Sequence, residues 1–562
     1  MKRHIILFFL IFLCCTLCNR KATVSFSTNE EKSLVALGQL WGFLKYHHPA
    51  VANGDYDWDA ELIKLIPKIL EAKNDSIWKK LLDNWVDSLP SVPENSDKKL
   101  PDLEIKTKPD YGELFNTEYF LPKTIDKIKH ILDNAVVSVN HYVNVDMTQY
   151  GQVFITNEPS YNEMLYPELS YRLLALFRYW NIVNYFFPYR ELCDQKWSTV
   201  LSDMLPEFVN AKNQEGYIFA CMKLATKIDD SHGFLFPDLK TGLFKVPFEV
   251  QFIENKLVVT KFTGIDTYVK EKIKIGDVIT NIDGEPVEDI VKRILPYIPA
   301  SNNPVKLRQI SSKILTGNST TVAIVIQRDE KLFKINISRY DPRLLNIPEY
   351  SNPQPDKEGY RILENNIGYV LPSSCKDEDV KTGTEKVLDD TKGVIIDFRC
   401  YPNSNYVASS FLPHLNLLEK GSFFPEILSN ARVTYPGYFF EQKNIRPAIV
   451  LQKNYDQKVI VIVNEYTQSA AEEQVMCFQT ASNVTVIGST TSGADGRIVN
   501  FSLPGNIRTR MTGMGVYYPD GGKTQRIGIR INEIVKPTIA GIRTGRDELL
   551  ERAIKIIKEN NH

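Results

Sequence analysis

The sequence predicts a multidomain α/β protein whose first part is helical and whose last part alternates strands with helices. Three observations predict this class. A pattern of apolar residues at helical spacing occurs twice at a constant offset, so that Trp41 matches Trp180. A stretch rich in β-forming residues follows from about 244 to 340, and strand and helix patterns alternate from 346 onward. At 562 residues the chain is too long for one hydrophobic core and should divide into several domains.

Composition narrows the classes of function that the protein could have. Hydrophobic residues make up 43% of the chain and charged residues 24%, as in folded soluble domains. The net charge of −1 gives no electrostatic reason to expect a nucleic-acid partner. Five cysteines lie beyond residue 20, scattered and without a C-x-x-C pair, so the sequence supports neither a disulfide framework nor a zinc site. We expect no metal and no organic cofactor.

Residues 1–20 predict an export signal. Lys2 and Arg3 precede an apolar run over 5–13 that is too short to span a bilayer. The alternative is an N-terminus that is disordered or buried. Cys18 could carry a lipid after cleavage, although the residues before it are not the small ones that a lipoprotein cleavage site prefers. We therefore expect an exported protein, periplasmic or attached to the cell envelope, and a lipid anchor stays open.

Two related helical units account for the first part of the chain. Residues 30–98 form the first unit and residues 165–238 the second, with 99–164 as the connecting segment. Each unit shows a helical pattern, a turn that runs from a tyrosine to a proline, and a second amphipathic helix. The matched pairs are Trp41 and Trp180, Tyr46 and Tyr185, Pro49 and Pro188, Trp58 and Trp197, and Pro67 and Pro206. The two units should pack on one another or on a shared core.

Only the second unit continues into Ser231 and His232, in a short polar loop after its last helix. The equivalent stretch of the first unit has no histidine, and a scaffold role shared by both units would not need that difference. An ordinary loop histidine is the simpler interpretation of His232 when it is considered alone. A catalytic interpretation needs a partner elsewhere in the chain.

Residues 240–342 predict a β domain. The order is a strand pair over 246–262, then a strand, an Asp-Gly turn and a helix over 273–295, and a closing hairpin over 320–340. This order, with IGDVITNIDGEPV within it, resembles a PDZ domain. The resemblance implies binding of an extended polypeptide along a sheet edge, with a free C-terminus as one ligand. The alternative is a β domain with a structural role only.

Residues 345–562 alternate strands and helices. Strands are expected over 367–372, 393–399, 458–464 and 484–489, with a closing helix over 547–557. These strands are wholly apolar, which predicts a sheet that is covered on both faces.

The most informative motif starts at Asn464 and reads NEYTQSAAEEQ. It follows an apolar strand and leads into a helix pattern, which places Ser469 at a helix N-terminus. Unpaired N–H groups and the positive end of the helix dipole would stabilise a developing oxyanion there. The alternative is a capping box of Ser469 and Glu472, in which the serine only satisfies backbone donors.

Most of residues 240–555 resembles the tail-specific (C-terminal processing) serine peptidase family. The resemblance rests on the PDZ-like segment and on the motifs VIIDFRCYPN, VNEYTQSAAEE, VIGSTTSGADG and GIRINEIVKPTIAGIRTGRDELLERAI. It implies a catalytic domain with the crotonase- and Clp-like ββα spiral, and serine-type hydrolysis of peptide bonds.

Members of this family differ in their catalytic base. One branch uses a lysine in a later glycine-rich loop, and Ala494 stands at that place here. The chain is more similar to the tricorn-core branch, in which an adjacent Ser-His pair meets the nucleophile. That likeness implies Ser469 as nucleophile, His232 as general base and Ser231 as a residue that orients the imidazole. Gln525 stands where that branch has a glutamate, and its amide can form hydrogen bonds but cannot supply negative charge.

The resemblance also implies an oxyanion hole. One donor would be the N–H of Ala470, and the other would be the N–H of Cys400, which stands where the family has a glycine. The predicted function is an exported serine endopeptidase that hydrolyses peptide bonds in extended or unfolded polypeptides. Two alternatives stay open: a non-catalytic peptide-binding protein that keeps the protease fold, and a serine enzyme that acts on a non-peptide ester or amide.

Overall fold

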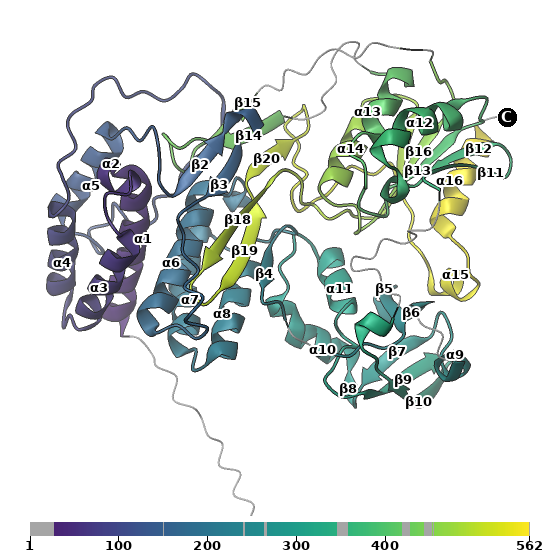
Figure 1. Cartoon of the computed structure of the whole chain (residues 1–562), viewed down its shortest axis with the longest axis horizontal. Coiled ribbons are helices and arrows are strands. Elements are labelled where there is room, and N and C mark those ends of the chain that lie inside the picture. Colours follow the sequence, from purple (N-terminus) through teal and green to yellow (C-terminus); the bar gives the residue numbers. More distant parts are fainter. Residues whose placement is uncertain are drawn as a thin grey trace, which may run out of the picture.

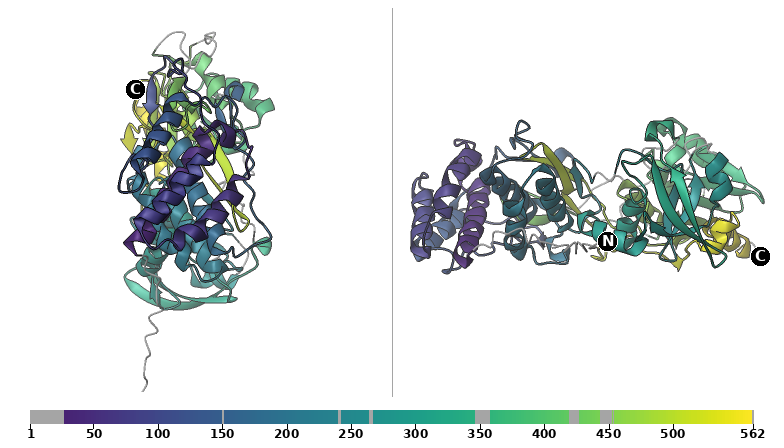
Figure 2. Two further views of the ribbon diagram at one scale, coloured as in Figure 1. Left: turned by 90° about the vertical axis from the view of Figure 1, so that its left-hand side faces the viewer. Right: turned by 90° about the horizontal axis from the view of Figure 1, so that it is seen from below.

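The computed structural model describes residues 27–149, 151–239, 242–263, 267–345, 358–418, 427–442, 452 and 454–560. The predicted export signal over 1–20 lies outside these residues. The described part is elongated, with helices at one end and the PDZ-like and α/β regions at the other (Figure 1 and Figure 2). No helix within the described ranges has both the length and the apolar character needed to cross a bilayer.

The helical end contains both predicted units. The first unit and the segment after it supply α1 (Thr28–His47), α2 (Pro49–Ala52), α3 (Trp58–Leu70), α4 (Asp75–Asp87) and α5 (Pro122–Asn134), and the second supplies α6 (Leu169–Phe186), α7 (Trp197–Asn210) and α8 (Gln214–Thr226). In each unit two tryptophans exchange hydrogen bonds, each Nε1 donating to the other's carbonyl: Trp41 with Trp58, and Trp180 with Trp197. Asn74 and Asn213 cap equivalent helices. The sequence repeat is therefore also a structural repeat.

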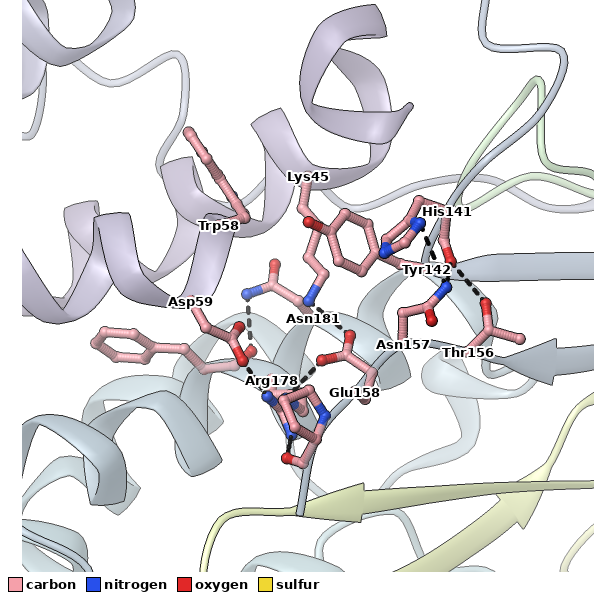
Figure 3. A network of polar contacts seen from close by, with 12 residues as sticks. Lys45, Trp58, Asp59, His141, Tyr142, Thr156, Asn157, Glu158, Arg178 and Asn181 are labelled. Carbon is pink, nitrogen blue, oxygen red and sulfur yellow. Dashed lines mark hydrogen bonds and ion pairs between the residues drawn. The ribbon is translucent and has the colours of Figure 1, made fainter. Parts of the chain in front are cut away.

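A buried ion network joins the two units (Figure 3). Glu158 contacts Lys45 of α1 at 2.6 Å and Arg178 of α6 at 2.7 Å. Arg178 also pairs with Asp59 of α3 and donates to the carbonyl of Ser502, in strand β18 (Ile498–Leu503), at 3.0 Å. Buried charges are costly unless they are paired. Two cations and two carboxylates therefore fix how both units and this distant strand meet.

The β-rich region forms a sheet in the order β10-β9-β7-β6-β5. Its elements are β5 (Phe248–Ile253), β6 (Lys256–Phe262), α9 (Thr267–Lys272), β7 (Val278–Ile282), β8 (Glu285–Pro286), α10 (Val287–Ile294), α11 (Asn303–Ser311), β9 (Thr321–Arg328) and β10 (Lys331–Ser338). Asp283 and Gly284 adopt φ of 49° and 87°, as a tight hairpin turn requires. The predicted order of strand pair, turn, helix and hairpin is confirmed. β5 lies at the sheet edge, beside α11.

The C-terminal region forms a sheet in the order β11-β12-β13-β16-β17-β21, parallel from β12 onward. Its strands are β11 (Tyr360–Leu363), β12 (Ile367–Val370), β13 (Val394–Asp397), β16 (Val459–Val463), β17 (Val484–Gly488) and β21 (Glu533–Ile534). One face packs on α12 (Val380–Leu388), α13 (Val407–Phe411) and α14 (Ala470–Phe478), and the other on α16 (Glu548–Glu559), which follows α15 (Ile539–Arg543). The predicted coverage of both sheet faces is confirmed.

Strands from the C-terminal region also cross to the helical end. β15 (Phe439–Gln442) pairs with β1 (Ile105–Thr107) on one side and with β14 (Ile427–Ala431) on the other, and β14 pairs with β20 (Met514–Tyr517). The hairpin of β18 and β19 (Ile507–Thr512) pairs with β4 (Phe234–Phe236), and β18 lies beside the hairpin of β2 (Val143–Asp146) and β3 (Gln152–Ile155). Short 3-10 helices occur in the connections: η1 (Met147–Gln149), η2 (Arg190–Leu192), η3 (Leu295–Tyr297), η4 (Pro342–Leu344), η5 (Pro372–Ser374), η6 (Asp377–Asp379) and η7 (Leu412–His414). The regions therefore interlock, and the segment 99–164 contributes paired strands rather than a plain connection.

Candidate active site

Ser469 lies on a sharp turn between strand β16 and helix α14. Its backbone has φ 56° and ψ −119°, and its N–H donates to the carbonyl of Ala494 at 3.1 Å. A serine that only caps a helix normally has an extended backbone. A residue other than glycine at positive φ costs about 1–3 kcal/mol, and such strain is concentrated at functional sites. The turn therefore differs from that of an ordinary cap and projects the serine ahead of the helix.

Glu472 stabilises this turn through hydrogen bonds. Its fully buried carboxylate accepts hydrogen bonds from the N–H of Ser469 at 3.2 Å and from the N–H groups of Gly493 and Ala494 at 2.8 and 3.1 Å. It also accepts from the Thr491 hydroxyl at 2.6 Å. Burial raises its pKa, and these donors oppose the shift. Glu472 thus supplies its half of the predicted capping box and also ties the loop over 491–494 to the nucleophile turn.

His232 lies in the loop between α8 and β4, and its ring is almost fully buried. Its Nδ1 lies 2.9 Å from the Thr512 hydroxyl, and that hydroxyl lies 3.1 Å from Oδ1 of Asp230. A carboxylate only accepts hydrogen bonds, so the hydroxyl proton goes to Asp230 and the hydroxyl oxygen accepts from the Nδ1 proton. This series of hydrogen bonds places the ring proton on Nδ1 and leaves the lone pair on Nε2, which is the arrangement that a general base needs.

The surroundings of the His232 ring favour its neutral form on balance. Burial lowers its pKa; the Asp230 carboxylate acts in the opposite direction, and Arg510 adds to the lowering. A neutral imidazole can take up a proton during a reaction. Asp230 would then stabilise the imidazolium through Thr512.

Strand register sets this geometry. The β4–β19 pairing places Phe234 opposite Arg510. Continued by two residues in antiparallel fashion, the same register places His232 opposite Thr512. The N–H of Thr512 donates to Oδ2 of Asp230 at 2.7 Å, which fixes the end of the pairing.

Gln525 lies beside the loop over 229–232 that contains His232, and within the described residues no hydrogen bond joins it to the ring. Its Nε2 donates to Oδ1 of Asp230 at 3.2 Å. The same carboxylate accepts from the His232 N–H at 3.0 Å. The negative charge that a glutamine cannot supply thus comes from Asp230, and Gln525 helps to hold that carboxylate.

Ser231 makes contacts other than the expected one. Its hydroxyl donates to the carbonyl of Ser492 at 2.8 Å and accepts from the N–H of Ser301 at 2.9 Å. The expectation that Ser231 orients the imidazole has no counterpart in these contacts; Thr512 is the ring's partner. Ser231 instead joins its loop to the loop after β17 and to the segment before α11. Its carbonyl also accepts from Nε2 of Gln468 at 3.1 Å, which brings the residues preceding the histidine and the nucleophile together.

Ser469 and His232 line the same cavity, which has a volume of about 1730 Å³. Within the described ranges no hydrogen bond joins the serine hydroxyl to the ring, and catalytic hydrogen bonds are often long before substrate binds. Further walls come from the PDZ-like region, including Val250 of β5 and Gln309 of α11. The cavity therefore runs from the edge of that region to the nucleophile turn.

The two expected oxyanion donors differ in their position relative to the cavity. Ala470 is the first residue of α14 and lines the cavity, and its N–H has no hydrogen-bond partner within the described part of the chain. The Cys400 side chain points into the core under α16, where its thiol donates to the carbonyl of Asp397 at 3.4 Å. Burial raises the pKa of this thiol to about 12. From this loop, the cavity is lined by Tyr401 and the two residues after it rather than by Cys400.

Comparison with known proteins agrees with this architecture. Residues 366–535 match the family model described as "Peptidase family S41", and residues 244–343 match the model described as "PDZ domain". Residues 366–535 are therefore similar to the S41 peptidase domain. The resemblance to tail-specific peptidases with a PDZ domain is thereby confirmed.

Individual relatives are distant. The chain is 22% identical over 249 residues to the carboxy-terminal processing protease CtpA of Bacillus subtilis (strain 168), and the aligned part covers 42% of this chain and 48% of that protein. The aligned part thus spans about half of that relative. Two solved structures share the fold: mature CPAF complexed with lactacystin has a TM-score of 0.53 at 13% identity, covering 70% of this chain and 99% of that one. Mature CPAF alone has a TM-score of 0.51 at 12% identity, covering 69% and 97%.

Sequence reasoning missed three residues of this site. Asp230 was visible in DDSH, two residues before His232, but its charge was not connected with the relay. Glu472 was seen only as a helix cap. Thr512 gave no signal, because only the pairing of β4 with β19 brings it to the ring.

Proposed function

We propose that this protein is a serine endopeptidase that hydrolyses peptide bonds in extended or unfolded polypeptides. The observation that carries the proposal is that Ser469, on its strained turn, and His232, whose Nδ1 contacts the Thr512 hydroxyl, line one cavity. A serine nucleophile needs an adjacent base that is itself held by a third group. Thr512 and Asp230 are that third group here.

The proposed reaction is acyl transfer. His232 Nε2 removes the hydroxyl proton of Ser469 as the oxygen attacks a peptide carbonyl, and then delivers that proton to the leaving amine. The negative charge moves to the carbonyl oxygen of the tetrahedral intermediate. The Ala470 N–H at the start of α14 is one donor to that oxygen. The backbone N–H of Cys400 is proposed as the other, because the next residue, Tyr401, lines the cavity although the Cys400 side chain does not. Each such donor contributes about 3–4 kcal/mol to the barrier reduction in serine proteases.

The proposed substrate is an extended polypeptide that also contacts the PDZ domain. β5 is the edge strand of that domain, and residues of both β5 and α11 line the cavity. An added peptide strand on β5 would have its main chain paired and its end directed toward Ser469. A free C-terminus is the proposed ligand of the PDZ domain, in line with the name of the carboxy-terminal processing protease CtpA.

Export is proposed from residues 1–20 alone, with a periplasmic or envelope-attached location and Cys18 as a site for a lipid. Fractionation of cells, with N-terminal sequencing of the mature protein, tests this part. A mature protein that keeps residues 1–20 would contradict it.

The activity is tested by labelling with a fluorophosphonate probe and by cleavage of an unfolded casein. We expect modification of Ser469 in the wild type, and loss of modification in both Ser469→Ala and His232→Ala. A folded wild type that neither reacts nor cleaves favours a non-catalytic peptide-binding protein. Cleavage of small esters without cleavage of casein favours the ester or amide hydrolase.

A further inference from the structure

Arg526 lies where three parts of the chain meet. Its own N–H donates to the carbonyl of Gly493 at 2.8 Å, within the S41 domain. Its guanidinium donates to Oδ1 of Asp194 at 2.7 Å and lies 3.5 Å from Oδ2 of Asp229, both in the second helical unit. Its Nε donates to the carbonyl of Ser301, next to α11 of the PDZ domain, at 3.2 Å. The Arg526 backbone thus lies in the S41 domain, and its side chain contacts both the second helical unit and the PDZ domain.

Asp229 is the important partner, because it begins the segment that ends at His232. Its carboxylate is buried, its φ is 47°, and it accepts from the N–H of Asp194 at 2.8 Å. Lys306 of α11 lies 3.8 Å from the same carboxylate. Arg526 and Lys306 therefore balance Asp194 and Asp229 in a neutral cluster of four charges. Without Arg526, a buried carboxylate would keep only one cation at long range.

Two consecutive residues of the S41 domain contact two consecutive residues of the loop over 229–232, which carries His232. Gln525 donates to Asp230 at 3.2 Å, and Arg526 pairs with Asp229. Two adjacent anchors fix both the position and the direction of the loop over 229–232. Arg526 keeps a positive φ of 68°, and such strain persists only where surrounding contacts hold it.

We propose that Arg526 is a positioning residue, which places the imidazole of His232 in front of Ser469 by holding Asp229. The inference rests on the proposed function for its kinetic consequences only. Its structural consequence, an ordered loop over 229–232, is independent of whether the protein cleaves peptides. Arg526 itself does not contact the reacting atoms.

The kinetic test compares Arg526→Met with Arg546→Met, which removes an exposed ion pair with Glu551 of α16. Misplacing a catalytic group by a fraction of an ångström to one ångström costs about ten- to a hundredfold in rate. We expect that loss in kcat for Arg526→Met with KM nearly unchanged, and no change for Arg546→Met. Arg526→Gly suits the positive φ, so it should fold, and added guanidinium ion should restore part of its kcat.

The second measurement is hydrogen exchange of the loop amides. The N–H groups of Ser231, His232 and Gly233 all donate hydrogen bonds, so they should be protected in the wild type. We expect faster exchange there in Arg526→Met and unchanged exchange in Arg546→Met. If the wild type proves inactive, the proposed function fails and this exchange difference still decides the inference. Unchanged exchange in Arg526→Met, or wild-type kcat in that variant of an active enzyme, would overturn it.

Discussion

Replacing Asp230 by asparagine tests the proposed relay most directly. The carboxylate accepts four hydrogen bonds: from the N–H of His232, from the N–H and hydroxyl of Thr512, and from Nε2 of Gln525. An asparagine keeps one acceptor oxygen, which suits the three donors at Oδ1. Its NH₂ group then faces the Thr512 N–H, where two donors cannot bond. The variant keeps the shape of the site, removes its charge and leaves the Thr512 N–H and the new NH₂ group facing each other without an acceptor.

The size of the effect follows from the distances. Hydrogen bonds of 2.9 and 3.1 Å link the ring nitrogen to the carboxylate oxygen through the Thr512 hydroxyl, so the two charges lie at most about 6 Å apart in the imidazolium state. At an effective dielectric constant of about 20, that attraction is about 3 kcal/mol. Losing it should lower kcat by about a hundredfold.

The pH profile separates this mechanism from general damage. Asp230 opposes the lowering of the His232 pKa, so the asparagine variant should have a still lower pKa at this ring. Activity is lost when the base becomes protonated, so the acid limb of kcat/KM should move to lower pH while the plateau falls. Steady-state kinetics on one peptide across the acid range measures both. An unchanged plateau, or an acid limb that moves upward, would refute the relay.

Three further predictions concern other parts of the molecule. Ser469→Ala should abolish peptide cleavage and fluorophosphonate labelling while costing at most the roughly 1 kcal/mol of an ordinary helix cap, and cleavage at the wild-type rate would exclude this nucleophile. Glu158→Gln should lower the free energy of unfolding by about 3–5 kcal/mol in urea titrations, because two buried cations lose their shared carboxylate; a loss below about 1 kcal/mol would contradict this. Burial lowers the pKa of His47 from 6.5 to about 3, so the unfolded chain binds an extra proton between these values and stability falls as pH falls through that window, by roughly 5 kcal/mol in total. His47→Phe, which introduces the residue that the second unit has at Phe186, should remove that part of the acid sensitivity in urea titrations; an unchanged slope would contradict the assignment.

Local patterns were enough to predict much of the fold. The apolar run ending at Val463 and the helix beginning at Ala470 occur where the sequence indicated, because a strand buried on both faces and a helix start have strong local signatures. The tryptophans of the two helical units also make matching contacts. Such features depend on residues close in sequence, or on a repeat that can be read directly.

Features that depend on distant pairing could not be predicted in this way. The hairpin of β18 and β19 comes from the C-terminal region yet pairs with β4 of the helical unit. Strand β13 is buried on both faces, so alternation could not show that the Cys400 side chain turns away from the cavity. The sequence shows Asp230 near His232, but its role in the relay could not be predicted, because its link to the ring passes through Thr512 of the distant strand β19.

The division of the site between chain regions has a physical consequence. Ser469 follows a strand of the S41 sheet, whereas His232 precedes a strand that pairs with β19, so neither region holds both groups. A shift of one residue in the β4–β19 pairing would turn the Thr512 side chain to the other face and remove the ring's partner. Asp230 opposes such a shift, because it bonds both the N–H and the hydroxyl of Thr512. The buried acid therefore acts twice, fixing the strand register that forms the relay and supplying the relay's charge.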